Sequence, residues 1–216
     1  MTTKLKILVF LTSALVVLDQ LTKLWTVRAL RYSGPPLPGE SPFSLQGPME
    51  GLKAWGHSSG SPEEIAVVPG FLSFIHAQNP GAAMGLAVGF EWRLPMFYGF
   101  TIVATWVLLK MYRELEPGDR FQSVTIALIL SGALGNLIDR VHKSTVTDFI
   151  KVYTEYAPLK AWLVSTFRTN EWPTFNVADA AIVVGVALYL VHYLFFEKDK
   201  ADAAGDAGRS PLEEGA

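Results

Sequence analysis

The chain alternates between long apolar runs and polar stretches, and four of the runs are long enough to suggest membrane spans. These runs are Leu5 to about Trp25, Leu94–Leu109, Phe121–Ile138 and about Phe175–Phe196. A helix needs roughly 20 residues to cross a bilayer. The first and fourth runs reach this length only if Asp19 and Asp179 lie at membrane depth or at its edge. The pattern predicts an α-helical membrane protein with four transmembrane helices.

The first run has one alternative interpretation, a cleaved signal peptide. Lys4 and Lys6 precede an uncharged stretch, Ile7–Leu18, as in such peptides. No small-x-small cleavage site follows, and the polar sequence DQLTK is an unusual continuation. We therefore favour a retained helix.

The unusual polar residues stand at alternate ends of the predicted spans. Four antiparallel spans bring those ends to one side of the membrane, whichever way the protein is inserted. The residues at these places are Asp19, Gln20 and Lys23; Asn79; Asn136, Asp139 and Arg140; and Asn176 and Asp179. The sequence therefore predicts a polar site on one aqueous face.

Basic residues bear on the orientation of the spans. The N-terminus and the short connection 110–120 are basic, which favours both termini on the cytoplasmic side. The basic residues after the third span argue the other way, so the charge pattern favours this orientation without deciding it.

The segments outside the spans differ in character. Residues 33–64 are rich in Gly, Pro and Ser and are predicted to be a flexible extracytoplasmic insertion. Ile65–Ile75 and Val146–Tyr153 are β-like and could form a small extracytoplasmic β-sheet. Residues 1–197 then form the membrane domain, and 198–216 a disordered cytoplasmic tail. Three tryptophans fit an interfacial belt, Trp92, Trp162 and Trp172.

Composition excludes several classes of function. The 216 residues are 50% hydrophobic and only 18% charged, with a net charge of −2 and no cysteine. Disulfides, thiolate metal sites and cysteine nucleophiles are therefore excluded. No basic tract suits nucleic acid, and neither HExxH nor a P-loop is present. The histidines lack metal-ligand spacing (His57, His76, His142 and His192), so we expect no metal and no cofactor.

Some of the polar residues suit structural roles. Asp19 and Lys23 are four residues apart on one helical face, and an ion pair is favoured over direct chemistry. Asn176 and Asp179 have N-cap and N3 spacing, so helix capping explains them at least as well as catalysis. Arg140 suits the end of the third span.

Small residues admit both structural and functional interpretations. Ser131 and Gly135 form a small-xxx-small pair, which is typical of helix packing. Residues 81–83, Gly-Ala-Ala, suit a turn or a close approach to a substrate.

Asp148 is the carboxylate least easily explained by structure alone. In the strand-like sequence VTDFIKVY it shares a face with Val146, Ile150 and Val152. A carboxylate on such a face should be paired, hydrogen-bonded or protonated. A strand edge open to water is the alternative.

Five sequence blocks occur in order: LDQLTK at 18–23, NPGAAMG at 79–85, SGALGNLIDR at 131–140, VTDFI at 146–150 and FNVADAAI at 175–182. Together they resemble signal peptidase II, the bacterial lipoprotein signal peptidase family of membrane aspartic proteases. The resemblance covers the four spans and the two β-like pieces, but not the 33–64 insertion or the tail. Met84 stands where the family often has Phe, and Ser131 where it often has Gly.

The resemblance implies an aspartic endopeptidase with Asp148 and Asp179 as the catalytic pair. Supporting residues match at Asn79, Asn136, Arg140, Asn176, Asp139, Asp19 and Lys23. The implied substrates are diacylglyceryl-modified prolipoproteins, cut just before the lipidated cysteine. The implied setting is the bacterial cytoplasmic (inner) membrane, with an extracytoplasmic active site, membrane lipids as partners and a monomeric enzyme. Two nearby carboxyls share a proton, so which aspartate is acid and which is base stays open.

Two alternatives to this function differ in class. One is a non-enzymatic four-helix membrane module, such as an assembly factor or a small transporter, which would explain the spans and their small-residue packing. The other is a presenilin-type intramembrane protease, but its GxGD motif is missing and Asp148 lies outside the spans.

Overall fold

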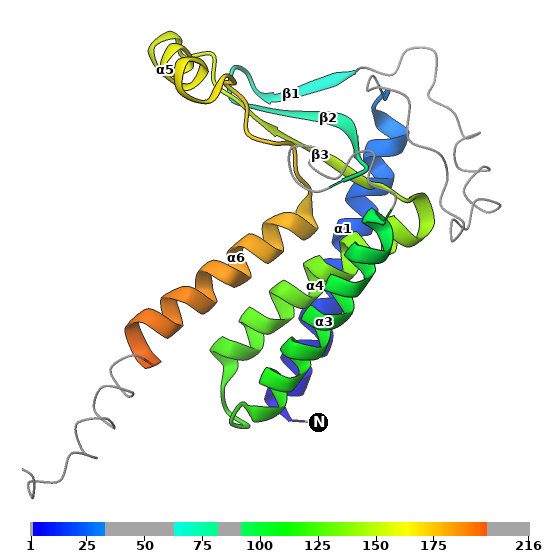
Figure 1. Cartoon of the computed structure of the whole chain (residues 1–216), viewed down its shortest axis with the longest axis vertical. Helices are drawn as coiled ribbons and strands as arrows, with labels where there is room; N and C mark the ends of the chain where they lie inside the picture. The colour runs from blue at the N-terminus through cyan, green and yellow to red at the C-terminus, as the bar shows by residue number, and fades with distance from the viewer. Residues whose placement is uncertain (1, 33–62, 82–91, 198–216) are drawn as a thin grey trace, which may run out of the picture.

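The computed structural model describes residues 2–32, 63–81 and 92–197, and these are mainly helical (Figure 1). Four long helices lie within these ranges: α1 (Thr3–Ala29), α3 (Arg93–Glu114), α4 (Arg120–Lys143) and α6 (Val177–His192). Each is long and apolar enough to cross a membrane. The last of them does so together with the start of the short π-helix that follows it, Tyr193–Glu197. The four predicted spans are therefore confirmed.

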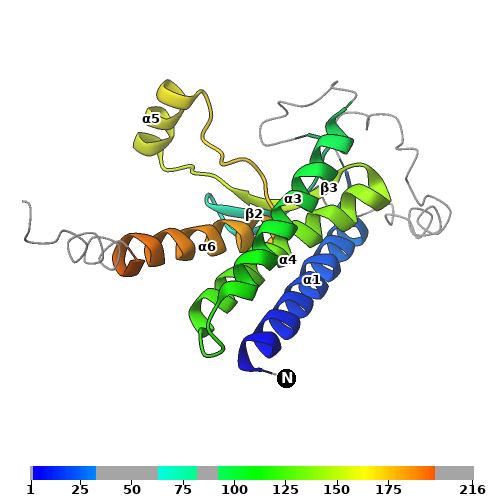
Figure 2. The ribbon, with the colours of Figure 1, turned by 60° about the horizontal axis from the view of Figure 1, so that its bottom comes forward.

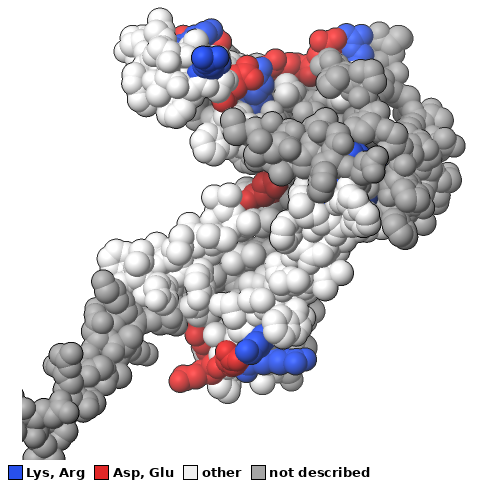
Figure 3. Space-filling model, in the orientation of Figure 1, with Lys and Arg blue, Asp and Glu red and all other residues white. Residues whose placement is uncertain are grey.

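Helix α4 is the centre of the helical part, because α1, α3 and α6 all pack against it. Its buried apolar residues join those of α1 and α3 in one core, made of Leu8, Leu108, Ile126, Ala127 and Leu130. The outer faces of the helices remain apolar, as Figure 3 shows by the long uncharged surface below the sheet. On α3, for example, Phe100 and Trp106 are 64% and 65% exposed. Exposed apolar faces of this extent are suited to contact with the lipid bilayer.

Small residues on α4 allow α1 and α6 to approach closely. A Cβ added at Gly132 would lie 2.2 Å from the carbonyl oxygen of Ala178 on α6. One added at Gly135 would lie 2.6 Å from a carboxylate oxygen of Asp19 on α1. Gly135 belongs to the pair of small residues interpreted as a packing motif, and the structure agrees with that interpretation.

A three-stranded antiparallel sheet lies at one end of the helices, with the order β1 (Glu64–Val68), β2 (Leu72–Asn79), β3 (Val146–Val152) (Figure 1). The predicted piece Ile65–Ile75 is in fact a hairpin, because Gly70 adopts a positive φ of 77° between β1 and β2. Strand β2 also continues to Asn79, four residues beyond the prediction. The sheet is therefore larger than predicted.

One helix was not predicted, α5 (Ala157–Phe167), between β3 and α6. Its eleven residues are too few to stand out as an apolar run, and only Pro158 in its first turn marks a helix start. Figures 1 and 2 place α5 on the side of the molecule where α6 lies. The predicted insertion is described only at residues 63–64, and the tail, Met84 and His57 lie outside the described residues.

Candidate active site

A cavity of about 800 Å³ opens where the sheet meets α4 and α6. Figure 3 shows the hollow between the uncharged helices and the sheet, with acidic atoms in its wall. Its lining comes from four places: Ala77–Gly81 at the end of β2, Asp148 on β3, Trp172–Phe175 before α6, and Arg140, Asp179 and Val183 on the two helices. Four of the polar residues selected from the sequence therefore line one cavity.

Asp148 is 3% exposed and is held by two amide side chains. Asn79 Nδ2 donates to its Oδ2 at 3.1 Å, and Asn176 Nδ2 donates to its Oδ1 at 2.7 Å. Burial, and then the negative charge of Asp179, raise the pKa of Asp148 to about 7, although both hydrogen bonds act in the opposite direction. This carboxyl is therefore suited to hold a proton near neutral pH. The expectation that it should be hydrogen-bonded or protonated is met by its contacts and its pKa.

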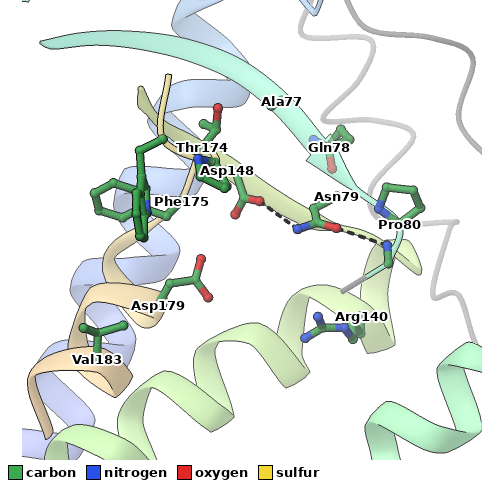
Figure 4. Close-up of a pocket in the computed structure, with 13 residues that line it drawn as sticks. Ala77, Gln78, Asn79, Pro80, Arg140, Asp148, Thr174, Phe175, Asp179 and Val183 are labelled. Carbon is green, nitrogen blue, oxygen red and sulfur yellow. Dashed lines mark hydrogen bonds between the residues drawn. The ribbon is translucent and has the colours of Figure 1, made fainter. Parts of the chain in front are cut away.

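Asp179 lies in the first turn of α6. Its backbone N–H donates to Asn176 Oδ1 at 3.0 Å, and the backbone N–H of Asn176 donates to Asp179 Oδ2 at 3.2 Å. This is the capping box predicted from their spacing. Capping does not use the whole carboxyl, because Asn136 Nδ2 also donates to Asp179 Oδ1 at 2.7 Å. The group still lines the cavity, where Figure 4 shows it pointing toward the carboxyl of Asp148.

Asn176 connects the two aspartates. Its amide nitrogen donates to Asp148 while its amide oxygen accepts from the backbone of Asp179. The residue is 0% exposed, so bulk water does not compete for these bonds. One buried side chain therefore holds the carboxylate of Asp148 and the backbone that carries Asp179.

The backbone before α6 is tied to β3, which brings the two aspartates together. The carbonyl oxygen of Phe175 accepts from the N–H groups of Phe149 and Ile150 at 3.0 and 2.8 Å. The N–H of Phe175 donates to Ile150 O at 3.1 Å. The start of α6, which carries Asp179, is thus fixed beside the middle of β3, which carries Asp148.

Arg140 enters the cavity from the last turn of α4, and Figure 4 shows its guanidinium on the Asp179 side. The guanidinium carbon lies 4.3 Å from the centre of the Phe97 ring, and Nη1 donates to Asn136 O at 3.4 Å. Tyr98 Oη donates to the Arg140 carbonyl at 3.1 Å. Helix α3 therefore positions this cation beside the two carboxylates.

A buried group of charges lies behind the cavity rather than in its lining. Lys23 Nζ is 2.8 Å from Asp19 Oδ2 and 3.7 Å from Asp139 Oδ2, and all three side chains are at most 2% exposed. Lys143 adds a second cation, 3.2 Å from Asp139. The ion pair expected from the spacing of Asp19 and Lys23 is therefore present.

This buried group is joined to the cavity by hydrogen bonds. Lys23 Nζ donates to Asn136 Oδ1 at 3.0 Å, and Asn136 in turn donates to Asp179. Asp19 accepts from the backbone of Ala178 at 2.9 Å. Asp139 accepts from the backbone N–H of Thr147 at 2.8 Å, next to Asp148. The group therefore holds both segments that bear the cavity carboxylates.

Sequence reasoning missed several contributors to the site. Phe97 and Tyr98 support Arg140 from a different helix, and Trp172–Phe175 and Val183 form part of the cavity wall. Nothing in the spacing of Phe97 or Val183 distinguishes them from ordinary lipid-facing residues.

The histidines within the described ranges have packing partners. His76 contacts Gln78 and the Leu30 carbonyl, and His192 contacts Gln122 and stacks on Phe121. Within residues 2–32, 63–81 and 92–197, no group of three or more His, Asp or Glu side chains is arranged to hold a metal ion.

Two carboxyls that face each other in a cavity, one with a pKa near 7, form an arrangement suited to general acid–base chemistry. One carboxylate can take a proton from water while the protonated partner donates a proton to the group under attack. The donors of Asn136 and Asn176 limit how the carboxyls can rotate.

Comparison with known proteins gives one consistent result. The family model described as signal peptidase (SPase) II matches residues 11–195. A lipoprotein signal peptidase of Geobacter metallireducens is 42% identical over 126 residues, which cover 58% of this chain and 70% of that protein. One of Geobacter sulfurreducens is 40% identical over 139 residues, covering 64% and 79% respectively.

Solved structures show the same fold. A bacterial membrane enzyme solved by the in meso method superposes with a TM-score of 0.61 at 24% identity, covering 90% of this chain and 89% of the other. A second has a TM-score of 0.57 at 26% identity, covering 87% and 92%.

Proposed function

This chain belongs to the signal peptidase II family, and we propose that it uses Asp148 and Asp179 as its catalytic pair. It is a membrane protease that removes signal peptides from prolipoproteins. The observation that supports the catalytic pair is that both carboxyls line one cavity and point toward each other (Figure 4). A non-enzymatic assembly factor or transporter is not favoured.

In the proposed mechanism the two carboxyls share one proton. The ionised carboxyl takes a proton from a water molecule, which attacks the carbonyl carbon of the scissile peptide bond. The protonated carboxyl donates its proton to the carbonyl oxygen. The carboxyl that took the water proton then donates it to the amide nitrogen. The other carboxyl recovers its proton from the oxygen as the C–N bond breaks, which releases the amine and regenerates the pair. The two aspartates titrate as a pair, so the roles of acid and base belong to the pair.

Four neighbouring side chains support the pair in this proposal. Asn79 and Asn176 donate to Asp148, and Asn136 donates to Asp179, so both carboxyls are held in fixed orientations. Arg140 stands beside them as a cation that can bind the substrate backbone. The remaining matched residues act through the buried hydrogen bonds behind the cavity rather than on the substrate; they are Asp19, Lys23 and Asp139.

We propose diacylglyceryl-modified prolipoproteins as the substrates, cut just before the lipidated cysteine. The cavity lining supports this, because it runs from the end of β2 down to Val183, in the second turn of the membrane-spanning helix α6. A substrate whose lipid stays in the bilayer would bring its peptide bond to this boundary. We also propose that the protein acts as a monomer, because the cavity and both of its carboxyls are complete within one chain.

The proposed location is the bacterial inner membrane, with the cavity on the extracytoplasmic side and both termini in the cytoplasm. Lys4 Nζ donates to the Leu115 carbonyl at 2.6 Å, so the basic N-terminus and the basic connection 110–120 lie at the same end of the helices. Positive charge in short loops favours the cytoplasmic side. The cavity lies at the opposite end.

The test uses the purified protein in lipid vesicles with two substrates. One is a diacylglyceryl-modified prolipoprotein, and the other is the same chain with its cysteine replaced by serine. The lipidated substrate should be cleaved just before its cysteine, as measured by product mass, and the serine form should resist cleavage. Equal cleavage of both would contradict the proposed lipid requirement.

A matched pair of variants tests the catalytic assignment separately. Asp148→Asn should abolish cleavage, whereas Asp119→Asn, which alters a cap at the far end of α4, should retain it. Retained cleavage in Asp148→Asn would contradict the role of the pair.

A further inference from the structure

Helix α5 exposes an apolar surface that no other described element covers. None of its eleven residues is buried. Trp162 and Phe167 are 56% and 61% exposed, and Leu159 is 44% exposed. Its one charged residue is Lys160, which pairs with Glu155 just outside the helix at 2.7 Å. An isolated helix of this length is marginal in water, so a surface that accepts these side chains would stabilise it.

The large side chains lie on one side of α5. Leu159, Trp162, Leu163 and Phe167 follow the spacing i, i+3, i+4 and i+8, which places them in one stripe. The opposite side has the smaller residues Ala157, Ala161, Val164 and Ser165. The rings of Trp162 and Phe167 contact each other, with centres 5.9 Å apart. Trp, Phe and Leu are the side chains with which interfacial helices enter the boundary between lipid headgroups and acyl chains.

The connection between α5 and α6 limits how far α5 can lie from the bilayer. Nine residues, 168–176, separate its end from the start of α6, so they span at most about 30 Å. Phe175 and Trp172 within this connection donate backbone hydrogen bonds to Ile150 and Val152, so the connection runs along β3. Trp172, also in this connection, is 69% exposed. Figures 1 and 2 show α5 on the side of the molecule where α6 lies.

Both α5 and the membrane-spanning helices expose apolar side chains. The outer face of α6 is apolar and exposed, as at Leu190 (51%), and requires lipid. Figure 3 shows the outer side of α5 as uncharged, with charged atoms gathered beside it. Arg168, at the end of the helix, is an exposed cation that suits anionic lipid headgroups, whereas Lys160 is already paired with Glu155. A lipid surface therefore matches the exposed apolar side chains of α5 and the cation at its end.

We propose that α5 is an interfacial helix that lies on the bilayer surface beside the cavity, with its apolar stripe among the lipid acyl chains. Its small side faces water. This placement anchors the end of the sheet opposite α1 to the membrane. The proposal depends on the spans and on α5 itself, and it does not require Asp148 or Asp179 to be catalytic.

The chain has no cysteine, so single cysteines can be introduced and labelled at chosen positions. Leu159→Cys and Phe167→Cys report on the stripe, and Ala161→Cys and Ser165→Cys report on the opposite side. Each variant is spin-labelled in vesicles of phosphatidylcholine and phosphatidylglycerol. Electron paramagnetic resonance then measures its collisions with oxygen, which concentrates in lipid, and with a water-soluble nickel complex.

Two further positions calibrate the measurement. Leu190→Cys on α6 gives the value for lipid, and Gly118→Cys in the exposed α3–α4 connection gives the value for water. The ratio of oxygen to nickel collisions should be several-fold higher at the stripe than on the opposite side, and should approach the Leu190 value.

Three results would overturn the proposal. Ratios near the Gly118 value on both sides would place α5 in water. Low collision rates with both reagents at the stripe would show a protein partner or a second copy on α5. Lipid-like ratios on both sides would show a helix immersed in the bilayer rather than one lying at its surface. The two stripe positions are independent, so one misfolded variant does not remove the test.

Discussion

The raised pKa of Asp148 predicts how cleavage depends on pH. Its pKa is about 7 instead of the ordinary 3.8, a difference of about 3 pH units. This corresponds to an ionisation that is less favourable by on the order of 4 kcal/mol, mainly because the group is buried. If the pair needs its shared proton, kcat/KM should fall above about pH 7, approaching tenfold for each further pH unit.

The hydrogen bond from Asn79 to Asp148 allows a test of whether the pKa of Asp148 sets this pH dependence. It favours the ionised form of Asp148 and so lowers its pKa. Asn79→Leu keeps a similar volume but removes this donor, so the pKa should rise. The alkaline fall in activity should move to higher pH by on the order of one unit.

The assay is cleavage of a diacylated prolipoprotein in lipid vesicles at about pH 5 to 9, with substrate well below KM. The position of the alkaline fall is compared between the original protein and Asn79→Leu, independently of their absolute rates. A constant kcat/KM across the whole range would refute the reasoning, as would a shift to lower pH in Asn79→Leu.

Three other predictions concern packing, buried charge and the insertion. Gly132→Ala should lower the midpoint of thermal unfolding and cost about 1–3 kcal/mol of stability, because the added Cβ would overlap a backbone oxygen of α6. The control Gly99→Ala places its Cβ in open space and should leave the midpoint unchanged. Equal midpoints for the two variants would contradict the close packing. Lys23→Met should destabilise the protein by about 3–5 kcal/mol, because it leaves the buried carboxylate of Asp19 without its cation. Adding Asp19→Asn should recover part of this loss, as measured by thermal unfolding in detergent. An unchanged stability in Lys23→Met would contradict the ion pair. Deletion of residues 35–60 should leave cleavage largely intact, and its complete loss in a folded deletion would show that the insertion shapes the site.

The spans could be predicted from the sequence because their signal is long and local. Each apolar run supplies many residues that point to the same conclusion, and all four helices are present. The shorter elements gave weaker signals. The turn at Gly70 was overlooked although the dipeptide Pro69–Gly70 is a turn signal. Helix α5 was missed because eleven residues form too short an apolar run.

The candidate site was predictable in its members but not in its contacts. The ends of antiparallel spans had to meet, so Asn136, Asn176 and Asp179 could be grouped in advance. That Asn176 would bind Asp148 and cap Asp179 with one amide group depends on the pairing of Phe175 with β3. This pairing joins distant parts of the chain, and no local pattern specifies it.

The central claim is that Asp148 and Asp179 together perform the hydrolysis. The most direct test is the cleavage rate of a diacylated prolipoprotein by purified Asp148→Asn and Asp179→Asn, beside Asp119→Asn as a folded control. Each change in the pair should lower the rate by at least about a hundredfold, while the protein stays folded in the membrane. A rate within a few-fold of the original in either variant would contradict the account.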